Sequence, residues 1–469
     1  MTSWLPSIDG RDGPIYMAIV ASLAEDVAAG RLPEGSRLPT HRDLADALGV
    51  TVGTITRAYA EAHRRNLVSG EVGRGTFVKG PSDLASTGPL WRRAAFTDPN
   101  MVDLSTARAT SPLTAETVSK MLQQIAADPA LGGLLDYRLD AGIQAHREIL
   151  AEWLNLRGVP ADASQVVITS GAEHAINLAM HTIAHPGDTV LCATLTYPNV
   201  KYIAEGLHLK LHGLPMDAEG VIPAGFEQAC KAGGVRALYI IPTLQNPTSA
   251  VLPLSRRQQI VDIARAHDVT IIEDNVFGFL EPDAPTTLIT LAPERTIHVS
   301  SFSKLMAGGL RVGYVVAPPA LAQRIGYNLH VNLIVVPPLM VELVTRLIVD
   351  GTAAKQIERQ RADMAPMHAR VAKIFAGLTV QTRATSSMAW LKLPHHWESE
   401  HFATIARQRG VLVSPAPHFH VGKGEPPNAV RIGLGGAKGE RLDRALTTLA
   451  DLARSAPPPA APQDTLRIV

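Results

Sequence analysis

The sequence predicts an α/β protein with a small N-terminal helical module and a much larger α/β body. Within the first 79 residues, three helical patterns precede a short, glycine-rich hairpin pattern. From residue 101 onward, apolar strand-like runs alternate with helical ones, which is typical of a largely parallel sheet covered by helices on both faces. Residues 80–100 carry Gly, Pro and Ser without a sustained period, which indicates a linker.

Composition sets limits on compartment and partners. The 469 residues are 46% hydrophobic and 19% charged, as in a globular protein with a sizeable core. The formal net charge is +1, so any affinity for DNA must come from a local patch. Cys192 and Cys230 lie far apart, so we expect neither a disulfide framework nor a metal site. No signal peptide is evident, which predicts a cytoplasmic protein.

The most apolar stretch is residues 331–349. Two prolines, Glu342 and Arg346 interrupt it. A membrane-spanning helix needs about 20 predominantly apolar residues, so this stretch favours a buried helix and no contact with a membrane.

Three helices are predicted in the N-terminal module. Apolar side chains recur at helical spacing in each: Ile15, Ile19, Leu23 and Val27; Leu44 and Leu48; Ile55, Tyr59 and Ala62. Thr40 is the expected N-cap of the second helix, and Gly49 its end. Residues 68–80 then predict a hairpin, with Gly73, Arg74 and Gly75 at its tip.

This order of elements describes a winged helix-turn-helix, whose last helix enters the major groove. The hydroxyls at its start are suited to base edges, and the arginines to phosphates. The candidate DNA-binding residues are Arg42, Thr51, Thr54, Thr56, Arg57, Gly73, Arg74 and Gly75. Residues 37–79 carry seven Lys/Arg against four Asp/Glu, an excess too small to distinguish DNA binding from a three-helix packing module by charge alone.

The stretch "GRLPEGSRLPTHRDLADALGVTVGTITRAYAEAHRRNLVSGEVGRGTFV" closely resembles the DNA-binding domain of the GntR family of bacterial regulators. The resemblance implies a reader of double-stranded operator DNA. In that family an arginine that contacts DNA usually follows the turn, and here Val52 takes its position. Base contacts are therefore expected from Thr51, Thr54, Thr56 and the wing.

Lys304 lies in an unusual setting, "SSFSKLMAGGLRVGYV", among small, hydroxyl and apolar residues. A buried lysine loses solvation, so its pKa falls and the neutral amine becomes a nucleophile. Such an amine forms Schiff bases with aldehydes. The aldehyde cofactor pyridoxal 5'-phosphate (PLP) also needs phosphate donors, an acid opposite its ring nitrogen and a group near its ring oxygen.

Residues of the right types follow the predicted strands. Gly171, Ala172 and Glu173 stand where a strand turns into a helix, whose N-terminal amides bind anions. Asp274 ends a strand, at the edge where α/β sheets hold ligands. The other candidates are Ser301, Ser303 and Arg311 for the phosphate, Asn246 for the ring oxygen and Tyr197 for stacking. Each alone has an ordinary structural reading, but their order along one domain favours a cofactor site.

Residues 101–455 resemble fold-type I aminotransferases of class I/II, in the subgroup of kynurenine/α-aminoadipate aminotransferases, most closely at "SSFSKLMAGGLRVGY". The resemblance implies PLP as cofactor, a large sheet domain and a small C-terminal α+β lobe. It implies Lys304, Asp274 and Tyr197 as catalytic residues. It assigns Arg431, with Asn246, to the substrate carboxylate, and Tyr137 to the phosphate of the other subunit in a homodimer.

One position departs from the aminotransferase pattern. Phe277 stands in the cofactor site where the family has a tyrosine that donates a hydrogen bond to the ring oxygen. Phenylalanine has no hydroxyl, so we expect amino-group transfer to be slow, and the sequence leaves open whether the body is an active enzyme.

A GntR-type reader followed by an aminotransferase-like body resembles the MocR/GabR subfamily of transcriptional regulators. The resemblance implies a cytoplasmic, PLP-dependent homodimer that binds operator DNA and senses an amino compound or PLP itself. The expected boundaries are 1–79 for the reader, 80–100 for the linker, 101–455 for the body and 456–469 for a disordered tail. The alternative is a working amino-acid aminotransferase that carries a DNA-binding module. A scaffold without cofactor is disfavoured because Lys304 and Asp274 are present.

Overall fold

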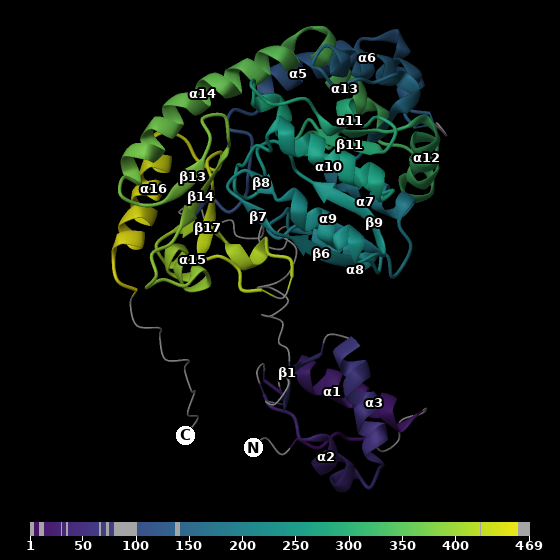
Figure 1. The fold of residues 1–469 in the computed structure, drawn as a ribbon, viewed down its shortest axis with the longest axis vertical. Coiled ribbons are helices and arrows are strands. Elements are labelled where there is room, and N and C mark those ends of the chain that lie inside the picture. Colours follow the sequence, from purple (N-terminus) through teal and green to yellow (C-terminus); the bar gives the residue numbers. More distant parts are fainter. Residues whose placement is uncertain are drawn as a thin grey trace. The chain divides into compact units, whose positions relative to one another are not determined.

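In the computed structural model, the chain forms two compact units, Met1–Phe96 and Thr97–Val469 (Figure 1). The structure describes residues 4–8, 14–29, 31–33, 36–64, 67–71, 75–78, 101–136, 141–422 and 424–457. The predicted linker, the hairpin tip at Gly73 and Arg74, Tyr137 and residues 458–469 lie outside the described residues.

The N-terminal unit has the predicted three helices and hairpin. They are α1 (Ile15–Ala28), α2 (His41–Leu48), α3 (Val52–Arg64), β1 (Val68–Glu71) and β2 (Gly75–Val78). The hydroxyl of Thr40 accepts a hydrogen bond of 3.2 Å from the Asp43 amide, so Thr40 caps α2 as predicted. Gly49 ends the helix at φ 63°, in the left-handed region that favours glycine.

The core of this unit lies between the three helices. Its buried residues include Ile19, Leu23, Leu44, Ile55, Tyr59 and Ala62. Ile15 was predicted to face inward, and this was wrong, because its side chain is 49% exposed. It is the first residue of α1, one turn before the residues that pack in the core. A periodic pattern cannot show where along a helix its packing partner begins.

The larger unit is built on a seven-stranded sheet in the order β4-β12-β11-β10-β9-β5-β6. The strands are β4 (Val166–Thr169), β12 (Gly313–Val316), β11 (Thr296–Ser301), β10 (Thr270–Asp274), β9 (Val235–Ile240), β5 (Thr189–Ala193) and β6 (Lys210–Leu214). The sheet is parallel as predicted except at β12, which runs antiparallel to both β11 and β4. A strand buried on both faces is an apolar run in either direction, so the sequence does not reveal this reversal.

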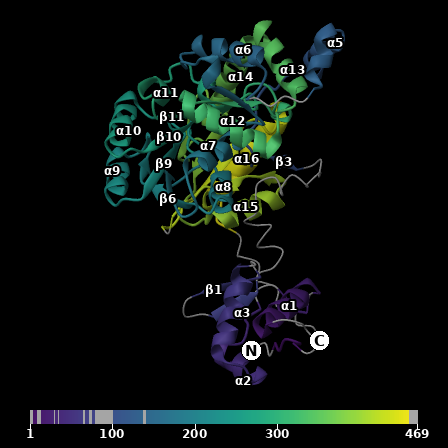
Figure 2. The ribbon, with the colours of Figure 1, turned by 90° about the vertical axis from the view of Figure 1, so that its right-hand side faces the viewer.

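Helices pack around this sheet (Figure 2). They are α5 (Ala115–Ala126), α6 (Gln144–Asn155), α7 (Ala172–Ile183), α8 (Asn199–Gly206), α9 (Pro223–Lys231), α10 (Leu254–Ala266), α11 (Leu288–Leu291), α12 (Pro319–Leu333) and α13 (Pro338–Val349). Short 3-10 turns are η2 (Pro129–Leu134), η3 (Ala163–Gln165), η4 (Gly278–Leu280), η5 (Gly308–Leu310) and η6 (Ala416–His418), and β7 (Met216–Asp217) pairs with β8 (Gly220–Val221).

The apolar stretch at residues 331–349 does not form the single buried helix that was predicted. It contains the end of α12 and all of α13, with a break between them. Pro337 and Pro338 lack the amide donors that a continuous helix needs. Val331 and Val349 are 65% and 70% exposed, so only one face of each helix is buried. Within the described ranges, no helix is long and apolar enough to cross a membrane.

The predicted C-terminal α+β lobe is present. It holds an antiparallel sheet of β13 (Val380–Thr382), β14 (Met388–Lys392), β17 (Ala429–Gly433) and β16 (Ser414–Pro415), together with α15 (Ser399–Gln408) and α16 (Gly439–Arg454). The first strand of the body also belongs here, because β3 (Val102–Asp103) pairs with β15 (Val411–Leu412). Such pairing of distant segments has no local sequence signal.

The long helix α14 (Thr352–Ile374) links the two parts of the larger unit. Ile357 and Met364 are buried in the core of the large sheet. Met367 and Val371, farther along, are buried in the core of the C-terminal lobe. The helix therefore packs against both cores.

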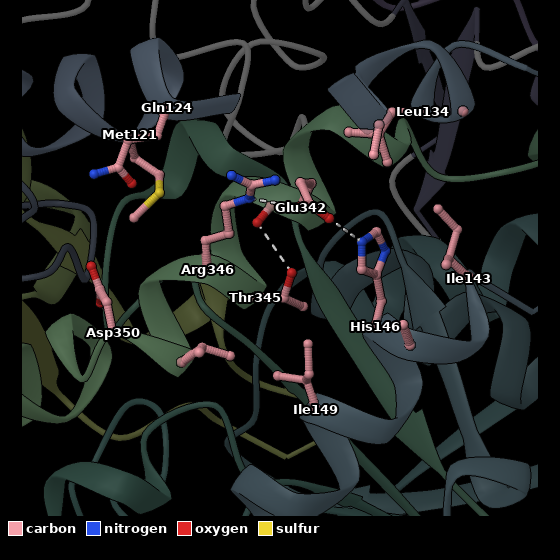
Figure 3. A pocket seen from close by; sticks show the side chains of 14 residues that line it. Met121, Gln124, Leu134, Ile143, His146, Ile149, Glu342, Thr345, Arg346 and Asp350 are labelled. Atoms are coloured by element: carbon pink, nitrogen blue, oxygen red, sulfur yellow. Dashed lines mark hydrogen bonds and ion pairs between the residues drawn. The ribbon is translucent and has the colours of Figure 1, made fainter. Parts of the chain in front are cut away.

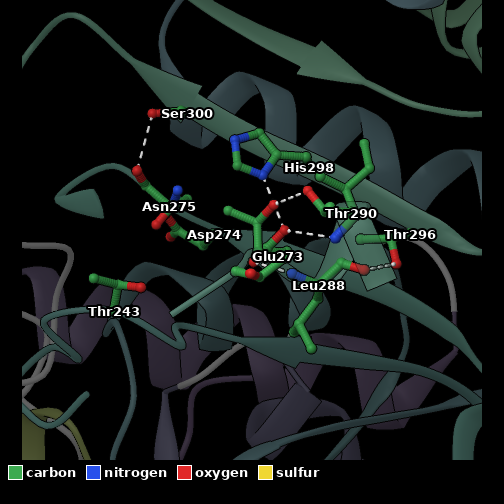
Figure 4. A network of polar contacts seen from close by, with 12 residues as sticks. Thr243, Glu273, Asp274, Asn275, Leu288, Thr290, Thr296, His298 and Ser300 are labelled. Atoms are coloured by element: carbon green, nitrogen blue, oxygen red, sulfur yellow. Dashed lines mark hydrogen bonds and ion pairs between the residues drawn. The ribbon is translucent and has the colours of Figure 1, made fainter. Parts of the chain in front are cut away.

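A buried polar network supports the centre of the sheet (Figure 4). The Glu273 carboxylate accepts hydrogen bonds from the amides of Leu288 (2.8 Å) and Ile289 (3.1 Å), and lies 3.0 Å from His298 Nδ1. Burial alone raises the pKa of Glu273, but the hydrogen bond and charge of His298 and the Leu288 amide outweigh it and lower the pKa overall.

Replacing Glu273 should destabilise the fold, because the buried donors around it lose an ionised acceptor. We expect Glu273→Gln to lower the free energy of unfolding at pH 7 by about 3 kcal/mol, measured by urea denaturation. Since the folded-state pKa lies below the ordinary 4.5, this contribution is present above that pH and is lost as the pH falls through the folded-state value. The difference from wild type should therefore shrink in acid.

A matched control is Glu294→Gln. Glu294 forms an ion pair of 2.9 Å with Arg265, but both side chains are more than 40% exposed. Its loss should cost at most about 1 kcal/mol. Equal effects of the two substitutions would show that the buried network does not stabilise the sheet.

Candidate functional site

One edge of the large sheet gathers the predicted cofactor residues. Asp274 ends β10, Ser301 ends β11, and Gly171 follows β4. The reversed strand β12 starts at this same edge, because Gly313 pairs with Thr169 and with Ser301. Arg311, two residues before Gly313, is thereby brought to the ligand-binding edge of the sheet.

Lys304 occupies the centre of this site. Its Nζ donates a hydrogen bond of 2.6 Å to the carbonyl of Ala107 and lies 5.8 Å from the centre of the Phe277 ring. Burial, followed by the positive charge of Arg431, lowers the pKa of Lys304 to about 8. An appreciable fraction of the amine is therefore neutral near physiological pH, as a nucleophilic lysine requires.

Asp274 is buried beside the lysine. One carboxylate oxygen accepts a hydrogen bond of 2.6 Å from the Tyr239 hydroxyl, and the other accepts one of 3.2 Å from the Val276 amide. Burial raises the pKa of Asp274, although these hydrogen bonds and the charges of His298 and Lys304 oppose it. A further cation, such as a protonated ring nitrogen, would stabilise the ionised carboxylate. Asp274 therefore fits the role of a pyridinium partner.

A narrow cradle forms between α7 and Arg311. Gly171 precedes α7 with φ 88°, and a Cβ placed on it would lie 2.5 Å from Arg311 Nη2. Arg311 Nη2 donates to the Ser170 carbonyl at 2.9 Å. Ser301 lies at the end of the neighbouring strand, and its hydroxyl accepts a bond of 3.4 Å from the Ser303 amide. A guanidinium beside a helix N-terminus and two hydroxyls suits a phosphate group.

The carboxylate of Glu173 has a role that the sequence did not indicate. It accepts hydrogen bonds from the Tyr197 hydroxyl at 3.1 Å and from Asn199 Nδ2 at 3.0 Å. Burial, and then the negative charge of Glu173, raise the pKa of Tyr197. Glu173 thus orients Tyr197, in addition to presenting its own amide near the start of α7.

Arg431 and Asn246 come together across the two lobes. Arg431 is 2% exposed, and its Nη1 donates to Asn246 Oδ1 at 2.7 Å. Its Nη2 donates to the Ser105 carbonyl at 2.5 Å, and its guanidinium carbon lies 4.7 Å from the centre of the Phe419 ring. A buried, oriented guanidinium next to an amide is suited to a carboxylate.

Three contributors to this site had no sequence signal. Tyr239 lies within an apolar strand, where nothing distinguishes it from a core aromatic. The carbonyls of Ser105 and Ala107 belong to the segment that follows β3, which reaches Lys304 only because β3 joins the C-terminal lobe. Backbone acceptors of this kind depend on tertiary structure and leave no motif.

Of the candidate DNA-binding residues, Arg42 lies on α2, Thr54, Thr56 and Arg57 lie on α3, and Thr51 directly precedes α3. Arg42, Thr51, Thr56 and Arg57 are exposed, and Thr54 is half-buried. Thr51 also caps α3, because its hydroxyl accepts a bond of 3.2 Å from the Thr54 amide. The Thr56 hydroxyl donates to the Val52 carbonyl at 2.9 Å. Gly75 begins β2, whereas Gly73 and Arg74 lie outside the described part of the module.

Family comparisons agree with this division of the chain. Residues 100–449 match the family model of aminotransferase class I and II. The chain belongs to this family. Residues 15–78 match the model of the bacterial regulatory proteins of the gntR family. A GntR helix-turn-helix domain followed by an aminotransferase class I/II domain is the MocR/GabR-like architecture.

Two relatives share this architecture over most of their length. The uncharacterized HTH-type transcriptional regulator YdeF of Bacillus subtilis is 29% identical over 96% of each chain. The HTH-type transcriptional regulator TauR of Rhodobacter capsulatus is 27% identical over 87% of this chain and 90% of its own.

Solved structures confirm the fold of the body. LysN, an α-aminoadipate aminotransferase from Thermus thermophilus, was crystallised with a phosphopyridoxyl-leucine compound. It matches with a TM-score of 0.70 at 22% identity, over 79% of this chain and 96% of its own. The large mixed sheet and the small lobe are therefore those of fold-type I aminotransferases.

Proposed function

We propose that this protein is a PLP-dependent transcriptional regulator of the MocR/GabR type. Its N-terminal unit binds operator DNA, and its body senses an amino compound or PLP. The observation that best supports this proposal is that one chain contains both a GntR-type module and an aminotransferase-family body with a lysine in its site. The similarity to the transcriptional regulator YdeF extends over 96% of both chains. Such a regulator acts on the chromosome, in the cytoplasm, as a homodimer.

The site residues fit the proposed cofactor. When bound, PLP supplies a reactive aldehyde and an electron-withdrawing ring. Lys304 would hold it covalently and exchange a proton at Nζ. Asp274 would face the ring nitrogen, and Arg311 with the amides after Gly171 would hold the phosphate.

Arg431 and Asn246 are placed to recognise the carboxylate of an amino acid. Arg431 belongs to the C-terminal lobe and Asn246 to the large sheet domain. A ligand held by both would favour one arrangement of the lobes, and a ligand changes an equilibrium only through such differential binding. This is the proposed origin of the sensing response.

DNA binding is testable with the full-length protein and a duplex selected from a random library. We expect Arg42→Ala to weaken binding and to reduce the slope of log K against log salt by about one, because a phosphate contact is lost. Thr54→Ala should instead relax the sequence preference. Fluorescence anisotropy at several salt concentrations measures both effects.

Arg31→Ala is the control for charge alone. Arg31 is exposed in the same unit, but it forms an ion pair of 2.6 Å with Asp26. Its removal should leave the salt dependence of binding unchanged. The DNA-binding assignment fails if Arg42→Ala and Arg31→Ala behave alike, or if no duplex is selected.

Retention of Lys304 and Asp274 also favours a second candidate function, amino-group transfer. Phe277 is 2% exposed, lies beside Lys304 and offers no hydroxyl to the ring oxygen. A hydrogen bond to a charged oxygen is worth about 1.5 to 3 kcal/mol. We therefore expect Phe277→Tyr to raise a slow transfer rate by roughly one to two orders of magnitude.

The rate is measured as the release of 2-oxoacid after an amino acid is added to the PLP-loaded protein. Phe279→Tyr adds the same hydroxyl two residues away, where the side chain packs 6.3 Å from the Trp153 ring, and should have no effect. Wild-type turnover at ordinary enzyme rates would instead support a working aminotransferase.

A further inference from the structure

A second cavity lies apart from the lysine site. Its volume is about 1140 Å³, and it is bordered by residues that follow α6, β9 and β10 and by the first half of α14. Its polar and charged lining includes Arg157, Thr243, Asn275, Glu281, Lys355 and Arg361. Lys304, Asp274, Arg311 and Arg431 do not line it.

The charges around this cavity are unbalanced. Arg361 pairs with Glu358 at 2.9 Å, and Glu281 is 3.8 Å from Arg383. In the part of the chain that the structure describes, Arg157 and Lys355 have no carboxylate within ion-pair distance. Arg157 instead donates to the Trp153 carbonyl at 3.2 Å and lies over the Trp153 ring.

The two arginines also repel each other. Burial lowers the pKa of Arg157, Tyr314 opposes this effect, and the positive charge of Arg361 lowers the pKa further. Arg361 is held in place by the carbonyls of Phe279 (2.7 Å) and Leu280 (3.3 Å). An anion in the cavity that both guanidinium groups line would relieve this repulsion and gain charge-assisted hydrogen bonds.

One buried acceptor in the cavity wall also lacks a donor. Asn275 is 4% exposed, and its Oδ1 has no hydrogen-bond partner among the described residues. Its backbone carbonyl is already used, because it accepts from the Ser300 hydroxyl at 3.2 Å (Figure 4). A buried, unpaired amide oxygen is costly, so a ligand with a hydroxyl or amino group would gain from donating to it.

Another cavity, of about 750 Å³, differs from the cavity beside α14 in how its basic side chains are paired (Figure 3). There, Glu342 lies 2.6 Å from His146 Nε2 and 2.6 Å from Arg346 Nε. Arg346 also pairs with Asp128. His146 and Arg346 both have a carboxylate partner, whereas among the described residues only Arg361, of the three basic side chains in the cavity beside α14, has one, so the same argument does not extend to the cavity that His146 and Arg346 line.

We propose that the cavity beside α14 is a second ligand site, which binds a small hydroxy acid. Its carboxylate lies against Arg157 and Arg361, and its hydroxyl donates to Asn275 Oδ1. Because α14 packs against both cores, a ligand joining Arg157 to Arg361 attaches this helix to the large sheet domain. The proposal rests on neither DNA binding nor the role of Lys304.

The test is isothermal titration calorimetry of the full-length, PLP-loaded protein with malate. Arg431→Ala is used as the background, because it removes the carboxylate-binding arginine of the lysine site. We expect one malate per chain, and affinity at least tenfold weaker after Arg157→Gln or Arg361→Gln. Succinate, which lacks the hydroxyl, should bind several-fold more weakly than malate.

Arg236→Gln is the matched control. Arg236 is an exposed arginine whose Nε also donates to a backbone carbonyl, that of Ile183 at 2.6 Å, away from the cavity. Its replacement should not change malate affinity. If Arg157→Gln does not fold, Arg361→Gln and Lys355→Gln carry the test. Absence of malate binding in the millimolar range, or equal binding by parent and cavity variants, overturns the site, and equal binding of succinate overturns the role of Asn275.

Discussion

Lys304→Ala should abolish covalent attachment of PLP. Purified wild-type protein should be yellow, and borohydride should fix the cofactor to a peptide that contains residue 304. The structure explains the expected size of this effect. Burial lowers the pKa of Lys304 to about 8, and the lysine lies beside the buried Asp274. Absorption spectra and peptide mass spectrometry measure the loss.

Lys201→Ala is the control for this experiment. Lys201 is also part-buried, and its Nζ lies 3.4 Å from the carbonyls of Pro417 and His420. Burial lowers its pKa as well. Buried lysines that only satisfy carbonyls should not take up the cofactor, so Lys201→Ala should stay yellow and keep its label at Lys304. Label on another peptide would contradict the assignment of Lys304.

Arg431→Ala should remove most of the affinity for an amino-acid ligand. Truncating one partner of a buried, charge-assisted pair costs about 2 to 5 kcal/mol, which corresponds to roughly 30-fold to several thousand-fold in affinity. We expect a loss of affinity in the upper part of this range, because Arg431 is only 2% exposed and its guanidinium is oriented by Asn246 and Ser105. Spectral titration of the PLP-loaded protein with a panel of L-amino acids measures the change.

Two further variants separate charge from geometry. Arg431→Lys keeps the charge but loses the planar fork, so it should recover only part of the affinity. Arg383→Ala removes an arginine of the same lobe whose side chain is 49% exposed, and it should bind as wild type does. Amines without a carboxylate should be insensitive to all three substitutions. If Arg431→Ala binds amino acids as tightly as wild type, the carboxylate is held elsewhere.

Local patterns predicted much of this architecture. The helices of the N-terminal unit follow from apolar residues at helical spacing and from the capping residues Thr40 and Gly49. The alternation of strands and helices in the body follows from runs of apolar residues bounded by turns. These features are set by neighbours in the chain, so they remain visible in the sequence. The motif around Lys304 is also visible in the sequence. Its resemblance to the aminotransferase family predicted PLP as the cofactor.

Three features could be seen only in the structure. They are the reversed direction of β12, the exposure of the first residue of α1, and the break between α12 and α13. Each depends on which distant segment covers a given face. The same is true of the joining of β3 to the C-terminal lobe, which brings the carbonyls of Ser105 and Ala107 to Arg431 and Lys304.

The sequence by itself determined the types of elements, and it supplied the residues for the roles that we propose: a DNA-reading module, a nucleophilic lysine, an acid and a carboxylate-binding arginine. Only the tertiary structure decided that Tyr239 holds Asp274, that Glu173 orients Tyr197, and that two arginines face a separate cavity. The physical reason is that pKa values, unpaired acceptors and charge repulsion arise from groups that are close in space. For Tyr239 and Asp274, those groups lie 35 residues apart in the chain.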